Sequence, residues 1–90
     1  MEQTRNTILT LLTDKGYIIS QQRRIIIDSL CAIQYIGSID DFWLRLRQQH
    51  RIGWATVYNT IRLLEEEGCV IPTLCKDRQK HFVLCVEDGE

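Results

Sequence analysis

The sequence lacks any long apolar run and any Cys-x-x-Cys pair, and it holds a single proline. A helix needs about 20 mainly apolar residues to cross a membrane, so we expect no membrane span. The polar N-terminus also lacks the apolar region of a secretory signal, which predicts a cytoplasmic protein. In that compartment the four cysteines stay reduced, and their scattered positions imply no disulfide framework.

The sequence also has no excess of basic over acidic residues. The net charge is −1, although a protein that binds nucleic acid needs cationic side chains for the phosphates. The charges are unevenly distributed, because residues 1–62 carry a net +3 and residues 63–90 a net −4. This asymmetry indicates a basic face. Charge alone leaves equally open that these side chains only solvate the surface.

Signatures of catalysis are also absent. The sequence has no glycine-rich phosphate loop, no paired nucleophile and base, and no paired-carboxylate spacing, and each of its five glycines marks a break between elements. We therefore do not expect an enzyme. Ninety residues with 44% hydrophobic content suffice for one compact core, so we expect residues 1–90 to form a single domain.

Apolar side chains at helical spacing predict four helices. The first ends at Gly16, and the second begins after Ser20, a residue type that favours the N-cap position. The third, about residues 39–49, follows Ser38 in an S-x-x-D capping box. The fourth spans residues 54–68 and ends in three glutamates, which is unfavourable for the helix dipole.

Strand-forming residues follow the last helix. Residues 70–74 and 82–86 flank a polar turn at residues 76–79, a pattern typical of one β-hairpin. Four helices followed by a hairpin predict an α+β winged helix, in which a helix-turn-helix carries a C-terminal β-hairpin wing. In that fold the fourth helix presents its N-terminal turns to base edges in the major groove.

The fourth helix has two faces. With the apolar Val57, Ile61 and Leu64 facing inward, a rotation of about 100° per residue places three side chains on the opposite face and two beside it. Asparagine can bond an adenine edge, threonine and tyrosine can contact a thymine methyl or a phosphate, and arginine can hold guanine or a phosphate. The alternative is an ordinary amphipathic surface helix. The outward set is Ala55, Thr56, Tyr58, Asn59 and Arg62.

Three cations alternate along the expected hairpin turn. Lys76, Arg78 and Lys80 are placed where long side chains can reach a phosphate or the minor groove. We therefore predict that a wing at residues 74–82 contacts the DNA backbone. Charges at such positions also protect sheet edges from pairing with other sheets, and this explanation stays open.

These residues carry a resemblance to a known family. Residues 54–70 resemble the A-T-V-Y-R-x-L-x-x-L-x-x-x-G recognition helix of the ferric uptake regulator family of metal-dependent repressors, and residues 20–24 resemble its T-P-Q-R second-helix start. The likeness covers about residues 5–86. It implies a sequence-specific transcriptional regulator of double-stranded DNA, with Arg23 among the DNA-binding residues. It leaves a homodimer or a protein partner open.

The departures from the family pattern concern metal and specificity. Asn59 stands where the family usually has arginine, and Ile36 lies where many members place a metal-binding histidine. The family's further ligands are represented only by His81 and Cys85, with Asp88 close by, and no counterpart of its α/β dimerisation domain follows within this sequence. We therefore expect no bound metal and no cofactor.

A second hypothesis belongs to another functional class. A winged helix that has lost DNA binding can dock a protein through the same helix, and the near-neutral charge fits this alternative. An exposed Trp54 at the start of that helix would favour partner binding, whereas Trp43 and Cys31 are expected in the core.

Overall fold

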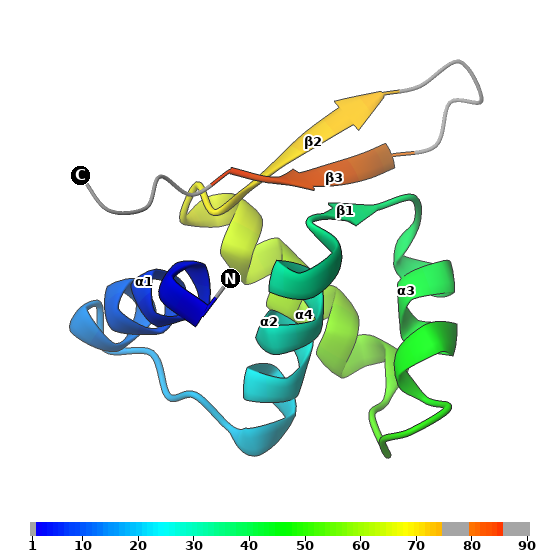
Figure 1. The fold of residues 1–90 in the computed structure, drawn as a ribbon, viewed down its shortest axis with the longest axis horizontal. Helices are drawn as coiled ribbons and strands as arrows, with labels where there is room; N and C mark the ends of the chain where they lie inside the picture. The colour runs from blue at the N-terminus through cyan, green and yellow to red at the C-terminus, as the bar shows by residue number, and fades with distance from the viewer. Residues whose placement is uncertain (1, 75–79, 86–90) are drawn as a thin grey trace.

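A computed structural model describes residues 2–74 and 80–85 of the chain (Figure 1). In this part, four helices and a three-stranded antiparallel sheet in the order β1-β3-β2 form a winged helix, which confirms the predicted fold class. The sheet lies across one end of the helices (Figure 1). The helices are α1 (Glu2–Asp14), α2 (Gln21–Ile33), α3 (Ile39–Leu46) and α4 (Trp54–Glu66), and the strands are β1 (Tyr35–Ile36), β2 (Val70–Leu74) and β3 (Lys80–Leu84).

Both predicted serine caps are present. The Ser20 hydroxyl accepts a hydrogen bond from the Arg23 backbone N–H at 3.2 Å, and the Ser38 hydroxyl accepts one from the Asp41 N–H at 3.1 Å. Each satisfies one of the N–H groups that the first turn of a helix leaves without a partner. The predicted third helix was too long, because it ends at Leu46 and the chain then turns toward the buried Ile52.

One core holds the elements together. Apolar faces of all four helices meet there with the inner side of the sheet, as the helical and strand periodicities require. The fully buried side chains from α2 and α4 pack at its centre. Its buried members are Ile8, Leu12, Ile26, Ile27, Leu30, Cys31, Ile36, Phe42, Leu46, Ile52, Val57, Ile61, Leu63, Leu64, Cys69, Val70 and Phe82.

The sheet contains a strand that the sequence did not predict. β1 pairs with β3 in the register Tyr35–Val83 and Ile36–Phe82, so the expected single hairpin is part of a three-stranded sheet. Ile36 is buried on the inner side, while Tyr35 is exposed on the outer side. A strand of two residues is too short to show an alternating pattern, which is why periodicity could not find it.

One of the three glutamates at the end of α4 has partners from far along the chain. The Glu67 carboxylate, whose side chain is only 12% exposed, accepts hydrogen bonds from Lys15 Nζ at 2.6 Å and from the Tyr17 hydroxyl at 2.8 Å. These bonds lower the pKa of Glu67, and the Glu67 partner raises the pKa of Lys15. The glutamate therefore ties the end of α1 to the end of α4.

Candidate nucleic-acid interface

The two faces of α4 separate as the sequence predicted. Val57, Ile61 and Leu64 are fully buried, and the hydroxyl of the equally buried Thr60 donates to the Thr56 carbonyl at 2.8 Å. On the other face three side chains are exposed, and two beside them are half-buried. The exposed residues are Ala55, Asn59 and Arg62, and the half-buried residues are Thr56 and Tyr58.

The start of α4 is held in place by the turn that precedes it. Trp43 donates its indole N–H to the Ile52 carbonyl at 2.9 Å, and Gln22 of α2 donates to the Arg51 carbonyl at 3.2 Å. The N-cap of α4 is Gly53, which brings no side-chain cap, and the first turn of α4 contains no acidic residue. No cap side chain and no acid of its own first turn therefore offset the positive end of the dipole of this helix.

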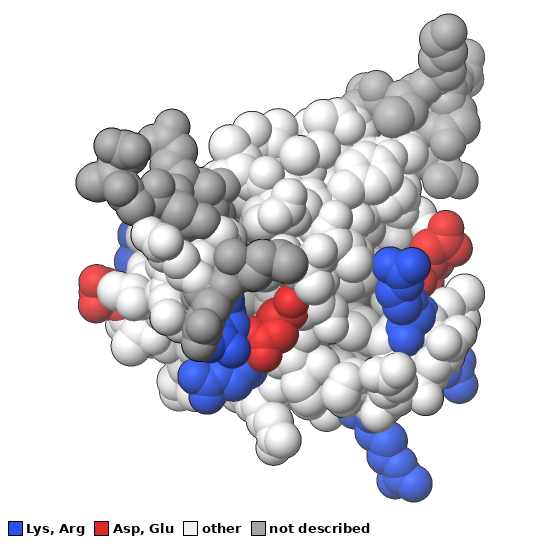
Figure 2. All heavy atoms as spheres, in the orientation of Figure 1, with Lys and Arg blue, Asp and Glu red and all other residues white. Residues whose placement is uncertain are grey.

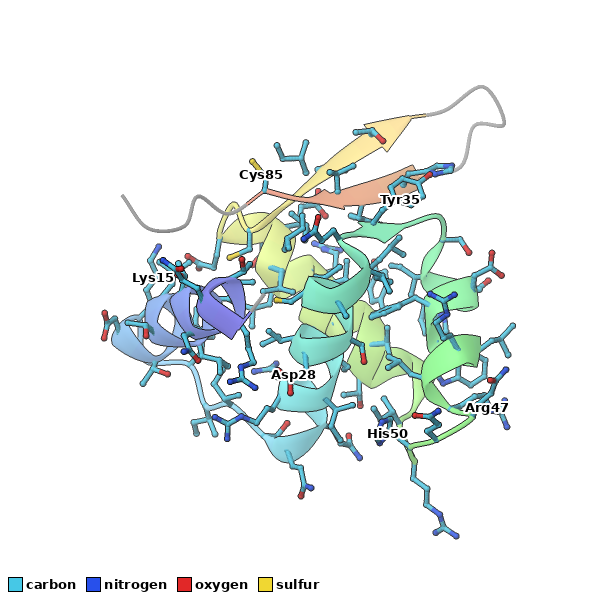
Figure 3. The ribbon with its side chains drawn as sticks, viewed as in Figure 1. Lys15, Asp28, Tyr35, Arg47, His50 and Cys85 are labelled. Carbon is cyan, nitrogen blue, oxygen red and sulfur yellow. The ribbon has the colours of Figure 1, made fainter. Side chains whose placement is uncertain are left out.

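Cationic side chains surround this turn. Arg47 lies with its guanidinium carbon 4.8 Å from the centre of the Trp43 ring, and Arg51 is exposed. Figure 3 shows Arg47 and His50 at the lower end of the molecule, beside the turn between α3 and α4. In Figure 2, the lysine and arginine side chains that the structure describes project from the middle and lower part of this view, with acidic side chains among them.

A ladder of side chains runs along one side of α4 at four-residue intervals. The Trp54 and Tyr58 rings stack with their centres 5.0 Å apart and their planes at 12°. Arg62 donates to the Tyr58 hydroxyl at 3.1 Å and approaches Glu66 to 3.8 Å. The hydrogen bond to Tyr58 raises the pKa of Arg62.

The ladder begins at a contact from another helix. The Trp54 indole N–H donates to Asp40 Oδ1 of α3 at 2.6 Å. The sequence-based DNA-binding set did not include Asp40, and it connected an exposed Trp54 with partner binding instead. The four-residue spacing of Trp54, Tyr58 and Arg62 was the available signal for a stacked row.

An acidic groove borders the ladder on the side of α3. Its volume is about 870 Å³, and Ile61 and Phe82 contribute apolar lining. The carboxylates at this groove would repel a phosphate backbone, although the cationic Arg62 also lines it. The acidic residues lining it are Asp40, Asp41, Glu65 and Glu66.

The remaining predicted contacts lie elsewhere. Arg23 is half-buried, and its guanidinium donates to the Ile18 carbonyl at 3.2 Å, so it is less freely presented than the residues of α4. Lys76 and Arg78 lie outside the described residues. Lys80 is the first residue of β3 and pairs with Leu74.

The residues in the described part of the chain do not fit the family's metal. Ile36, where a histidine ligand is common, is apolar and buried in the core. His81 forms a hydrogen bond with the Tyr35 hydroxyl through Nδ1. Cys69 is buried, and burial raises the pKa of its thiol to about 11. Within residues 2–74 and 80–85, no three His, Cys, Asp or Glu side chains are grouped as metal ligands.

The fold and the two-faced fourth helix define a winged-helix protein of the helix-turn-helix class. The ferric uptake regulator family matches residues 14–89, and the chain belongs to this family. Its members are transcriptional regulators and not enzymes. No curated protein gives a significant sequence match. In the described part of the chain, no helix has the length and apolar character that crossing a membrane requires.

Solved structures of manganese uptake regulators and of PerR proteins share the fold of this chain. A zinc-bound manganese uptake regulator is 24% identical, with a TM-score of 0.76 over 92% of this chain and 64% of its own. A zinc-containing PerR structure has 24% identity and a TM-score of 0.82 over 91% and 54% of the two chains. PerR from Streptococcus pyogenes, described as a peroxide-sensing gene regulator, has 24% identity and a TM-score of 0.80 over 91% and 57%. The chain thus spans between about half and two thirds of their length.

Proposed function

We propose that this chain binds double-stranded DNA in a sequence-specific way and acts in transcriptional regulation. In this proposal α4 enters the major groove, and the wing at residues 74–82 contacts the backbone. The observation that carries it is the division of α4 into a fully buried face and an exposed polar face. A helix with this division can be packed rigidly against its own domain while it offers side chains to base edges.

Asn59 is the residue best placed to read a base. It lies in the second turn of α4, it is exposed, and within residues 2–74 and 80–85 its side-chain amide has no hydrogen-bond partner. An asparagine amide can accept from adenine N6 and donate to adenine N7 at the same time. Arg62, one turn further along, supplies a cation for a phosphate or a guanine.

Backbone contacts come from the basic end of the molecule. Arg47 and Arg51 flank the turn before α4, and the helix dipole adds positive potential at the same point. The Arg62–Glu66 contact, at 3.8 Å between exposed side chains, is weak, so a phosphate can displace the carboxylate. Lys76, Arg78 and Lys80 of the wing are proposed to add phosphate contacts, and Arg23 a further one at the start of α2.

Protein docking through the same region is the second candidate function. The acidic groove beside α4 and the Trp54 ring, which is 40% exposed, favour it. A cationic protein segment would be attracted to the carboxylates that oppose DNA at this place. The two candidates differ in one measurable respect, since only DNA binding gives enrichment of particular duplex sequences.

Binding to random duplexes over a range of salt concentrations tests the proposal. Wild-type protein should enrich a motif, and its affinity should fall as salt rises. Arg62→Ala and Lys76→Ala should each flatten the salt slope by about one phosphate contact. Arg45→Ala is the matched control, because it removes the same charge from the side of α3 that faces β1.

The outcomes separate the two functions. Unchanged affinity and salt slope in both Arg62→Ala and Lys76→Ala would contradict the groove-and-wing arrangement. No enrichment of any sequence by the wild-type protein would favour protein docking.

A further inference from the structure

Trp54 occupies an unusual position for a bulky aromatic residue. It is the first residue of α4, it is 40% exposed, and its ring stacks on Tyr58, the residue before Asn59. An exposed side chain at the first helical position has few neighbours to fix its rotamer. Two contacts fix this one: the 2.6 Å hydrogen bond from its indole N–H to Asp40, and the stack on Tyr58 at 5.0 Å.

The two contacts hold different parts of the indole, one its N–H edge and the other a face of the ring. Asp40 belongs to α3, 14 residues earlier in the chain, and accepts at the polar edge of the ring. Tyr58 lies one helical turn further along α4 and covers a face of the ring. The result is an apolar wall of two parallel rings, tilted by only 12° from each other, along the edge of the exposed face of α4.

We propose that Asp40 is a positioning residue for DNA readout, which holds Trp54 on Tyr58 so that the stacked pair contacts thymine 5-methyl groups next to the base read by Asn59. This inference rests on the proposed DNA binding. Thymine is the one base that shows a methyl group in the major groove, and apolar side chains recognise it there. A ring fixed in advance loses little rotamer entropy when it meets that methyl group.

The charge of Asp40 works against DNA binding, which allows its two effects to be separated. A carboxylate at the entrance of α4 repels phosphates, so its removal alone should strengthen binding to any sequence. Asp41 is the next residue, it is also exposed, and its hydrogen bond to Ser38 uses the backbone N–H and not the carboxylate. Asp41→Ala therefore removes an equivalent charge without touching Trp54.

The experiment compares Asp40→Ala, Asp40→Asn and Asp41→Ala in two measurements. The first follows the indole N–H resonance of Trp54 in ¹⁵N-labelled free protein, assigned with Trp54→Phe, and its hydrogen-exchange rate. The second measures affinity for the selected duplex and for copies in which each thymine is replaced in turn by uracil, which lacks the methyl group.

Asp40→Ala should shift the Trp54 resonance, speed its exchange, and reduce the thymine-over-uracil preference at one position about two- to tenfold. Asp40→Asn should retain most of that preference, because its amide oxygen still accepts from the indole N–H. Asp41→Ala should match the wild type in the resonance and in the thymine preference.

Three results would overturn the inference. If all three variants change the affinity equally and keep the thymine preference, Asp40 affects DNA binding only through its negative charge. A shifted resonance with an unchanged thymine preference would make the contact structural only. An unshifted resonance in Asp40→Ala would remove the contact itself. If the wild type enriches no sequence, DNA binding fails together with the thymine readout, and the resonance of the free protein still tests the Asp40 contact separately.

Discussion

Replacing Ile61 by valine should lower the free energy of unfolding and leave DNA recognition unchanged. Asn59→Ala should instead change DNA recognition and leave the free energy of unfolding nearly unchanged. Ile61 is fully buried, and Ile→Val in such a place costs about 0.5–1.5 kcal/mol. A domain of this size loses about 4–8 °C in Tm per kcal/mol, so we expect a decrease of roughly 2–12 °C. The backbone of α4 and its exposed face should keep their geometry, because the substitution removes only one buried methyl group from the inner face.

Asn59 lies two residues away on the exposed face. Its replacement by alanine removes no hydrogen bond to the described part of the protein, so the free energy of unfolding should change by less than about 0.5 kcal/mol. Losing a bidentate contact to adenine should cost about 1–3 kcal/mol of discrimination at one base pair. That corresponds to a preference reduced roughly five- to 150-fold.

Thermal melts followed by circular dichroism give the stability, and selection from random duplexes in the cold, well below the melting transition of every variant, gives the motif. Wild-type protein is the reference in both. A loss of several degrees in Asn59→Ala, or a changed motif in Ile61→Val, would show that the two faces of α4 are not functionally separate and would refute the reasoning.

Two further predictions concern the link between α1 and α4 and the absence of metal. The partners of Glu67 lower its pKa in the folded state, so their stabilisation is present above the unfolded value of about 4.3 and is lost as the pH falls through the folded value. The Tm difference between wild type and Glu67→Gln should therefore be constant from about pH 7 to about pH 5 and shrink toward about pH 3. A difference independent of pH would contradict this. We also expect the protein to fold without a metal ion, so treatment with a chelator should leave its Tm unchanged. Purified protein that contains stoichiometric zinc and unfolds when the zinc is removed would disprove this prediction.

The helices were predictable because their signals are local. Ser20 and Ser38 each bond a backbone N–H three residues later, and the buried positions of α4 recur every three or four residues. Such signals need no knowledge of the rest of the chain. The exposed set of α4 followed from the same periodicity, so the amino-acid pattern alone was enough to assign the candidate site to the exposed face of this helix.

The contacts that refine the site are not local. Asp40 meets Trp54 across 14 residues, and Lys15 meets Glu67 across 52. No sequence spacing encodes these pairs, because they depend on how the helices pack against one another. β1 is a similar case, since Tyr35 and Ile36 become a strand only through their partners Val83 and Phe82 on β3. For the same reason the half-burial of Arg23 could not be read from its position at a helix start.

A nearly neutral chain can bind DNA when its acidic side chains are already engaged or lie away from the phosphates. Glu67 is held by Lys15 and Tyr17, and Glu66 lies near Arg62 at the C-terminal end of α4. The N-terminal end of the same helix carries no acid in its own first turn and has the exposed Arg47 and Arg51 beside it, against the single carboxylate of Asp40 on Trp54. Coulomb interactions between exposed charges fade within about 10 Å at moderate salt, so a phosphate near Gly53 responds to Arg47, Arg51 and Asp40 and hardly to the glutamates at the far end of the helix. The local arrangement of charge, and not its sum, decides where α4 can approach a duplex.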